Sequence, residues 1–135
     1  MGRRLVKQGA PSAVPIFYAA LLASAALVNA AGYLLGLWQE ETSFDEAAHF
    51  YTSFCGVAAL AWGGGRTGLL RQPARWWVLL SIGLVLGIAW EAVEWLLGII
   101  GGRRDTLIDL VMDAAGAIAA APLGRWALTS GRAQP

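Results

Sequence analysis

Long apolar runs alternate with short polar clusters along this sequence, and the alternation predicts a chain that crosses a membrane several times. The first run carries no charged residue from Gln8 to Gln39, more than the roughly 20 residues that a helix needs to cross the hydrocarbon core. Glycines and a proline punctuate the later runs, as loops require. We therefore predict a single domain over residues 1–135. Its four spans are Val14 to Trp38, Phe44 to Gly63, Trp76 to Ile100 and Thr106 to Leu128.

The composition favours an all-α membrane bundle over a soluble domain. Apolar residues make up 57% of the 135 residues and charged residues only 14%, whereas a soluble domain has roughly 25% charged residues. The net charge of +1 gives no general attraction to nucleic acid. The single cysteine, Cys55, excludes an internal disulfide or a thiolate metal cluster and fits a small packing residue.

The start of the chain has some features of a cleavable secretion signal. Arg3, Arg4 and Lys7 precede the first apolar run, and Val28-Asn29-Ala30 loosely fits a cleavage site. The apolar run continues to Trp38, however, which is too long for the core of a signal. We therefore expect an uncleaved first helix.

The basic residues predict the orientation of the bundle, because short loops rich in Lys and Arg stay in the cytoplasm. With four spans, two basic residues, Arg103 and Arg104, fall on one side, and the loop after the first span on that side is acidic. The other side carries Arg3, Arg4, Lys7, Arg66, Arg71, Arg75, Arg125 and Arg132. We therefore predict that both termini are cytoplasmic.

Acidic residues and one histidine occupy positions inside the predicted spans, where ionisable residues are rare and mark functional sites. They recur at spacings of three or four, which places them on one face of each helix. With neighbouring helices antiparallel, three helices bring them to a similar depth in the half away from the cytoplasm. The predicted site consists of Asp45, His49, Glu91, Glu94, Asp109 and Asp113.

Some of these residues also have a simpler interpretation. Asp45 and Asp105 lie where spans begin, so either can be an N-cap, and a single histidine is commonly just a hydrogen-bonded polar residue. The four deeper carboxylates lie too far inside their helices for capping, and unpaired buried carboxylates are costly. A bound cation, shared protons, the pair Arg103 and Arg104 folding inward, or a water-filled cavity can compensate them.

A divalent cation is the leading hypothesis for this compensation. Carboxylates with one imidazole suit a hard or borderline divalent metal ion, and paired ligands on neighbouring helices are typical of carboxylate-bridged metals in helix bundles. The Glu-x-x-His pair of such sites is absent here. Shared protons are the alternative hypothesis, and they favour a proton-coupled carrier.

Two further spacings have a functional and a plain interpretation. Asp45, His49 and Ser53 step by four, like a catalytic Asp-His-Ser set, but no nucleophile elbow surrounds Ser53 and a triad also needs an oxyanion hole. Small residues four apart suit close helix contact, although they are common in any membrane helix. The pairs are Gly32 with Gly36, Gly83 with Gly87, and Ala115 with Ala119.

Three segments carry a resemblance to a known family. They are Asp45 to Phe50 (DEAAHF), Trp90 to Trp95 (WEAVEW) and Asp105 to Ala117, with aspartates at 105, 109 and 113. Together they resemble the YjdF-like family of bacterial inner-membrane proteins, and the last segment is also similar to VanZ-like proteins. The resemblance implies a small multi-pass helical protein in a bacterial inner membrane. The loop from Gly101 to Arg104 is shorter than is usual in YjdF-like proteins.

These observations leave three classes of function open. The first is a metal-dependent enzyme acting on an anionic lipid or envelope precursor, with Glu91 and Glu94 as candidate catalytic residues. Arg103 and Arg104 either bind the anionic group of that substrate, which guanidinium suits, or lie at the lipid headgroups. The second is a proton- or cation-coupled transporter. The third is a structural or regulatory membrane subunit, and a homo-oligomer is compatible with all three.

Overall fold

The computed structural model describes residues 13–39, 43–70, 75–98, 103–123 and 126. Within these residues the chain forms four α-helices and one short 3-10 helix, and the predicted all-α membrane bundle is confirmed. A further helical turn at residues 121–123 follows the last helix. The elements are α1 (Ala13–Leu34), η1 (Leu37–Gln39), α2 (Phe44–Thr67), α3 (Trp76–Leu97) and α4 (Arg103–Ala119).

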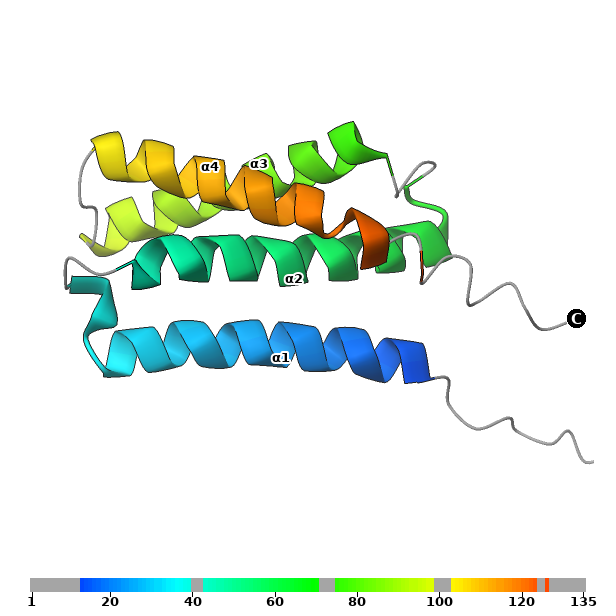
Figure 1. Cartoon of the computed structure of the whole chain (residues 1–135), viewed down its shortest axis with the longest axis horizontal. Coiled ribbons are helices and arrows are strands. Elements are labelled where there is room, and N and C mark those ends of the chain that lie inside the picture. Colours follow the sequence, from blue (N-terminus) through cyan, green and yellow to red (C-terminus); the bar gives the residue numbers. More distant parts are fainter. Residues whose placement is uncertain (1–12, 40–42, 71–74, 99–102, 124–125, 127–135) are drawn as a thin grey trace, which may run out of the picture.

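The four helices lie side by side, and each runs antiparallel to the next in the chain (Figure 1). Helix α2 occupies the centre, with α1 on one side and the pair α3 and α4 on the other. The first turn of α1 and the last turn of α4 therefore lie at the same end of the bundle. We call the opposite end, where α2 and α4 begin, the acidic end. The side of the membrane that each end faces remains a prediction.

Helix α2 differs from its neighbours in composition. Three helices are long and apolar enough to cross a membrane: Ala13–Leu34, Trp76–Leu97 and Asp105–Leu123. The 24-residue α2 is long enough but more polar, with Asp45, Glu46 and Arg66 in its terminal turns. The same helix buries seven residues, whereas α1 buries three. Its polar residues are tolerated because much of its surface faces the other helices instead of lipid.

The chain reverses direction after α1 through a glycine turn. The α-helix ends at Leu34, earlier than the predicted span, and Gly36 has a φ of +70°, a conformation that favours glycine. The rings of Trp38 and Phe44 then fold back onto Gly32, where a Cβ atom would collide with both. Gly32 therefore allows a close approach of Phe44 at the start of α2, and Gly36 allows the reversal.

Glycines also set the spacing between α3 and α4. A Cβ atom on Gly83 would collide with Ala117 of α4, and one on Gly87 would collide with the Asp113 carboxylate. For Gly83 and Gly87 the structure thus supports close helix contact over the plain interpretation. Because Gly87 has no side chain, the carboxylate of Asp113 fits between the two helices.

The contact between α2 and α4 depends on Gly116, which lies outside the predicted small-residue pairs. A Cβ atom on Gly116 would collide with the backbone carbonyl of Phe50 in α2. Ala115 and Ala119 are exposed, which agrees with the plain interpretation of that pair. The small-residue face that α4 turns inward lies one residue further along, at Gly116 and Ala120.

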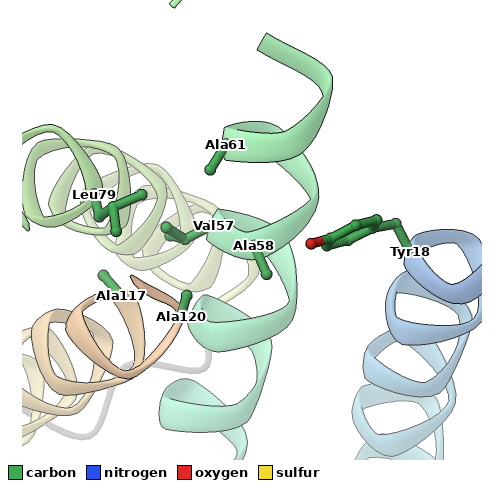
Figure 2. Packing of buried hydrophobic residues seen from close by; sticks show 7 residues of the cluster. All are labelled: Tyr18, Val57, Ala58, Ala61, Leu79, Ala117 and Ala120. Atoms are coloured by element: carbon green, nitrogen blue, oxygen red, sulfur yellow. The ribbon is translucent and has the colours of Figure 1, made fainter. Parts of the chain in front are cut away.

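An apolar core fills the half of the bundle away from the acidic end. Figure 2 shows Tyr18 reaching from α1 toward α2, with side chains of α3 and α4 on the other side of α2. The Tyr18 ring stacks on Trp62 with centroids 5.0 Å apart, and its hydroxyl donates to the Leu123 carbonyl at 3.0 Å. The buried residues of this core are Tyr18, Val57, Ala58, Ala61, Leu79, Ala117 and Ala120.

Candidate metal centre

The predicted polar residues meet at the acidic end, between α2, α3 and α4. His49 comes from the second turn of α2, Glu94 from the last turns of α3, and Asp109 and Asp113 from α4. Their exposed fractions are 3% for His49, 8% for Glu94, 2% for Asp109 and 4% for Asp113. Helical spacing therefore predicted the shared faces correctly, and the bundle turns those faces toward one another.

The two nitrogens of His49 have different surroundings. Nδ1 lies 3.2 Å from Oδ2 of Asp113, at hydrogen-bond distance. Nε2 faces Oδ1 of Asp45 at 3.7 Å and Oε1 of Glu94 at 3.9 Å. Both of these separations are too long for a hydrogen bond. Nε2 is buried and has no hydrogen-bond partner in the part of the chain that the structure describes.

Asp113 is held on its backbone as well as its side chain. The Ser53 hydroxyl donates to the Asp113 backbone carbonyl at 2.7 Å, and Gly87 leaves room for the carboxylate. His49 is thus hydrogen-bonded to Asp113, and the proton of the Ser53 hydroxyl is engaged with a carbonyl. This arrangement gives no support to the Asp-His-Ser hypothesis, in which His49 would accept that proton.

The two tryptophans beside the glutamates of α3 have different positions. The Trp90 indole N–H donates to Oε1 of Glu94 at 2.7 Å, the same oxygen that faces His49. Trp95 is 69% exposed, so it points away from the site. Trp90 therefore forms a wall of the site and orients Glu94.

Three overlapping groups of side chains can hold a metal ion. Their ligand atoms lie within 4.8 Å of one another, and two bonds of about 2.4 Å to a shared cation span that distance. Each group shares one residue with each of the others. The groups are Asp45 with His49 and Glu94, His49 with Glu91 and Asp109, and Asp45 with Asp105 and Asp109.

The N-cap interpretation of Asp45 and Asp105 is wrong. The N-cap of α2 is Ser43, and Asp45 lies in the first turn of that helix. Helix α4 begins at Arg103, so Asp105 also lies inside a first turn. Both aspartates belong instead to the groups that can hold a metal ion, and Asp105 was not among the predicted ligands.

Within the described residues, several buried polar atoms at this end of the bundle have no hydrogen-bond partner. They are Asp45 Oδ1, Glu46 Oε2, His49 Nε2, Glu91 Oε1 and Asp109 Oδ1. Such atoms are rare in native proteins, and a bound ion is one way in which they are satisfied. Four of the five residues belong to the three metal-holding groups. Glu46 does not, and residue spacing carried no signal for its burial.

The positive charges that the structure describes lie far from this site. The side chains of Arg66 and Arg75 lie at the other end of the bundle, in the last turn of α2 and at the N-cap of α3. Arg103 and Arg104 form the first turn of α4, but their side chains are outside the described residues, so their predicted anion-binding role stays a prediction.

Two cavities adjoin the site. The smaller, of about 210 Å³, is lined by His49, Asp113 and residues of α1, η1, α2 and α3. The larger, of about 630 Å³, lies between α1 and α3 and includes Glu94. Asn29, Trp38 and Trp90 line both cavities, so the two adjoin along these side chains. Residue spacing carried no signal for Asn29 or Trp38, because only the reversal after α1 brings Trp38 over the site.

The family described as "Predicted membrane protein (DUF2238)" matches residues 10–130 of the chain. The chain belongs to this family. The match supports the predicted resemblance, since DUF2238 is the YjdF family. No curated protein and no solved structure matches the chain.

Membership in the DUF2238 family and three apolar helices establish a membrane protein. A bacterial inner membrane remains a prediction, as does the likeness of the last segment to VanZ-like proteins. Neither the family description nor the fold assigns a reaction, so the geometry of the site is the basis for a function.

Proposed function

We propose that this protein binds a divalent cation at the acidic end of the bundle and uses it to hydrolyse a phosphate ester at the membrane. The observation that carries the proposal is the Nε2 atom of His49, which has no hydrogen-bond partner among the described residues. This atom is buried and faces two carboxylates, while the other ring nitrogen is engaged by Asp113. A buried imidazole lone pair beside carboxylates is a metal ligand set.

Asp113 acts as a positioning residue in this proposal. An ionised carboxylate only accepts hydrogen bonds, so Asp113 holds the proton of His49 on Nδ1 and leaves the lone pair on Nε2. Metal-binding histidines commonly donate their second N–H to a carboxylate in this way. Asp113 belongs to none of the three metal-holding groups, which supports the positioning role over that of a direct ligand.

The remaining ligands are the carboxylates that face Nε2. Asp45 and Glu94 supply one carboxylate oxygen each, from α2 and α3. Asp105 and Asp109 complete the adjoining groups, and we assign Glu91, which also lies in one of them, to proton transfer. This set of oxygens and one nitrogen suits Mg²⁺, Mn²⁺ or Zn²⁺ better than a soft ion.

A divalent ion held by these residues would supply activation of a water and polarisation of a phosphoryl oxygen. Glu91 would accept the proton of that water as the water oxygen attacks phosphorus and the bond from phosphorus to the ester oxygen breaks. Glu91 would then return the proton to the departing ester oxygen, so that the products would be phosphate and an alcohol. The buried Oε1 of Glu91 has no hydrogen-bond partner among the described residues, which supports its assignment as the proton acceptor.

Packing at the opposite half favours an enzyme over a carrier. A carrier needs a path from its site to both sides of the membrane. In the described part of the bundle, the apolar core of Tyr18, Val57 and Leu79 lies between the site and the other end, and each of these side chains is at most 1% exposed. A substrate therefore reaches the site from the acidic end or laterally between the helices.

The first test is metal content. Protein purified in detergent without chelator is equilibrated with Zn²⁺, Mn²⁺ or Mg²⁺, desalted and analysed for bound metal per chain. We expect about one ion or more per wild-type chain and loss of binding in His49→Ala and Asp109→Asn. Glu46→Gln is the matched control, because this buried acid of α2 lies outside the three groups. A wild-type chain with well under one ion would overturn the proposal, and proton-coupled transport would replace it.

The second test is turnover. Protein in nanodiscs that contain phosphatidate is supplied with the ion it binds, and release of inorganic phosphate is measured. We expect release by wild type, and a fall of about 10²-fold or more in Glu91→Gln, as for loss of a general base. The Glu91→Gln variant should still bind a measurable amount of the ion, because the metal ligands are unchanged. Metal binding without any phosphate release would reject the hydrolase and leave a cation-binding carrier or subunit.

A further inference from the structure

The cleft between α1 and α3 borders the candidate metal centre and shares Glu94 with it. It has a volume of about 630 Å³, within the range of about 300–1,000 Å³ that is typical of ligand sites. One wall comes from the last turns of α1 and the other from the last turns of α3. Its lining residues are Asn29, Ala30, Tyr33, Leu34, Gly36, Trp38, Trp90, Val93, Glu94 and Leu97.

The rim of this cleft is apolar and faces outward. Leu34 is 80% exposed, Tyr33 72% and Leu97 67%, and each belongs to a helix with the length and composition of a membrane span. In a bilayer these side chains meet hydrocarbon, so a cleft between them opens sideways into the acyl-chain region.

The inner side of the cleft is polar and meets the metal centre. Glu94 lines the cleft, and its Oε1 is the oxygen that faces His49 Nε2 at 3.9 Å. Asn29, Trp38 and Trp90 line both this cleft and the cavity at His49. A molecule in the cleft thus has apolar walls at one end and the candidate cation centre at the other.

We infer that this cleft holds the hydrocarbon chain of a membrane amphiphile whose anionic phosphate headgroup reaches the His49 centre past Trp90. The inference rests on the proposed function for the headgroup, because a bound cation is what makes the acidic site attract an anion. The apolar walls favour a hydrocarbon chain. The cation favours a phosphate headgroup with a net negative charge over a zwitterionic headgroup. The substrate therefore enters sideways from the leaflet and does not leave the membrane.

Trp90 has a defined place in this arrangement. Its indole is held by the hydrogen bond to Glu94 at 2.7 Å and stands at the boundary between the two cavities. An aromatic ring with one polar edge suits the level at which a hydrocarbon chain meets a headgroup. We assign Trp90 to the positioning of the ester group beside the cation.

The test fills the cleft from either wall. Ala30→Trp and Val93→Trp place an indole in the cleft, because both residues line it. Ala31→Trp and Ala92→Trp are matched controls: these neighbours are exposed and do not line the cleft. Each variant is checked for folding by circular dichroism and for metal content, which should equal that of wild type.

Binding is measured in nanodiscs by native mass spectrometry with a phosphonate analogue of phosphatidate, which cannot be hydrolysed at the phosphorus–carbon bond. We expect retention by wild type and both controls, and a loss of roughly tenfold or more in both cleft variants, since overfilling a packed site is costly. Phosphatidylcholine should be retained less than the phosphonate by wild type.

The outcomes separate this inference from the proposed function. If wild type binds no metal and releases no phosphate, the proposed function fails, and retention of the phosphonate still reports on the cleft. If metal content and turnover are normal but the cleft variants retain the phosphonate as well as the controls do, the cleft is not the chain site. Equal retention of phosphatidylcholine and phosphonate would reject the anionic headgroup.

Discussion

The two halves of this bundle use the same faces of α2 and α4. The side chains on those faces are polar in one half and apolar in the other. On α2, the residues at successive four-residue steps are Asp45, His49, Ser53, Val57 and Ala61. The first three approach the candidate metal centre, and the last two belong to the apolar core. On α4, Asp105, Asp109 and Asp113 are followed by Ala117 in the same way. One continuous buried face thus changes from polar to apolar along each helix.

The two halves also differ in whether the described part of the protein satisfies its own buried polar groups. In the apolar half, the Tyr18 hydroxyl has an acceptor and the other core side chains are aliphatic, so packing accounts for it. In the polar half, Asp45, His49, Glu91 and Asp109 each keep a buried atom to which no described residue is hydrogen-bonded. We therefore expect the stability of the first half to be independent of added ions, and that of the second half to depend on them.

The largest expected effect concerns the side of the membrane on which each half lies, because a fused reporter is active on one side and inactive on the other. The basic residues predict that the acidic end faces away from the cytoplasm. A fluorescent reporter fused after Pro135 should therefore fold and fluoresce in the cytoplasm, and an alkaline phosphatase fused after Gly102 should be active outside. The reverse pattern at both positions would invert the bundle and place the metal centre on the cytoplasmic side.

The boundary between the halves is the most sensitive point of the fold. Gly116 touches the α2 backbone, so Gly116→Leu should force α2 and α4 apart and prevent recovery of a folded bundle. Overpacking typically costs about 1–3 kcal/mol and more where backbone must move. Gly63→Leu is the control, because nothing lies within 4 Å of a Cβ atom there. Size-exclusion elution and circular dichroism give the answer, and a well-folded Gly116→Leu protein would contradict this packing.

A cavity in the apolar half should weaken the protein without affecting ion binding. Leu79 is fully buried, and Leu79→Ala should lower the free energy of unfolding by about 2–5 kcal/mol. Reversible unfolding in mixed micelles measures this loss, with and without the divalent ion. Because the site lies in the other half, the ion should stabilise Leu79→Ala by as much as it stabilises wild type. A smaller stabilisation of the variant would show that the halves are coupled.

Two carboxylates of the polar half should not behave independently. Glu94→Gln and Asp109→Asn each remove a charge from the shared site. We expect their effects on the free energy of unfolding to be coupled by about 0.5–3 kcal/mol, as for members of one network. A double-mutant cycle with the ion present measures the coupling. Additivity within error would mean that the two carboxylates occupy separate sites.

The smallest expected effect concerns the one long-range hydrogen bond of the Tyr18 side chain. Tyr18→Phe removes the donor to the Leu123 carbonyl and should cost about 0.5–1.5 kcal/mol of stability, equally with and without the ion. Tyr33→Phe is a matched control, since Tyr33 is 72% exposed. A loss that appears only when the ion is present would not fit a purely structural bond.

Helical periodicity accounts for the part of the site that the sequence predicted. Spacings of three and four place Glu91 with Glu94, and Asp109 with Asp113, on shared faces whatever the details of packing. The cost of buried charge then predicts that these faces turn inward, as His49, Glu94, Asp109 and Asp113 do. Local rules of this kind require no knowledge of the tertiary structure.

Features that depend on how helices meet were not predictable in the same way. The choice between Ala115 and Gly116 as the contact face of α4 depends on the rotation of that helix against α2. Trp38 reaches the site only because the chain reverses at Gly36. The position of Asp113 on Nδ1 of His49, and not in the ligand groups, also follows from packing. Residue spacing contains none of this information.

The polar character of the central helix also has a consequence for synthesis of the protein. Acids, a histidine and an arginine make α2 a poor candidate to enter the bilayer alone, although it is the helix around which the others assemble (Figure 1). Its neighbour α1 is long and apolar enough to cross the bilayer and carries no charged residue. We therefore expect α2 to be retained at the insertion machinery until a neighbouring helix packs against it. The hairpin of α1 and α2 would then enter the bilayer as a unit.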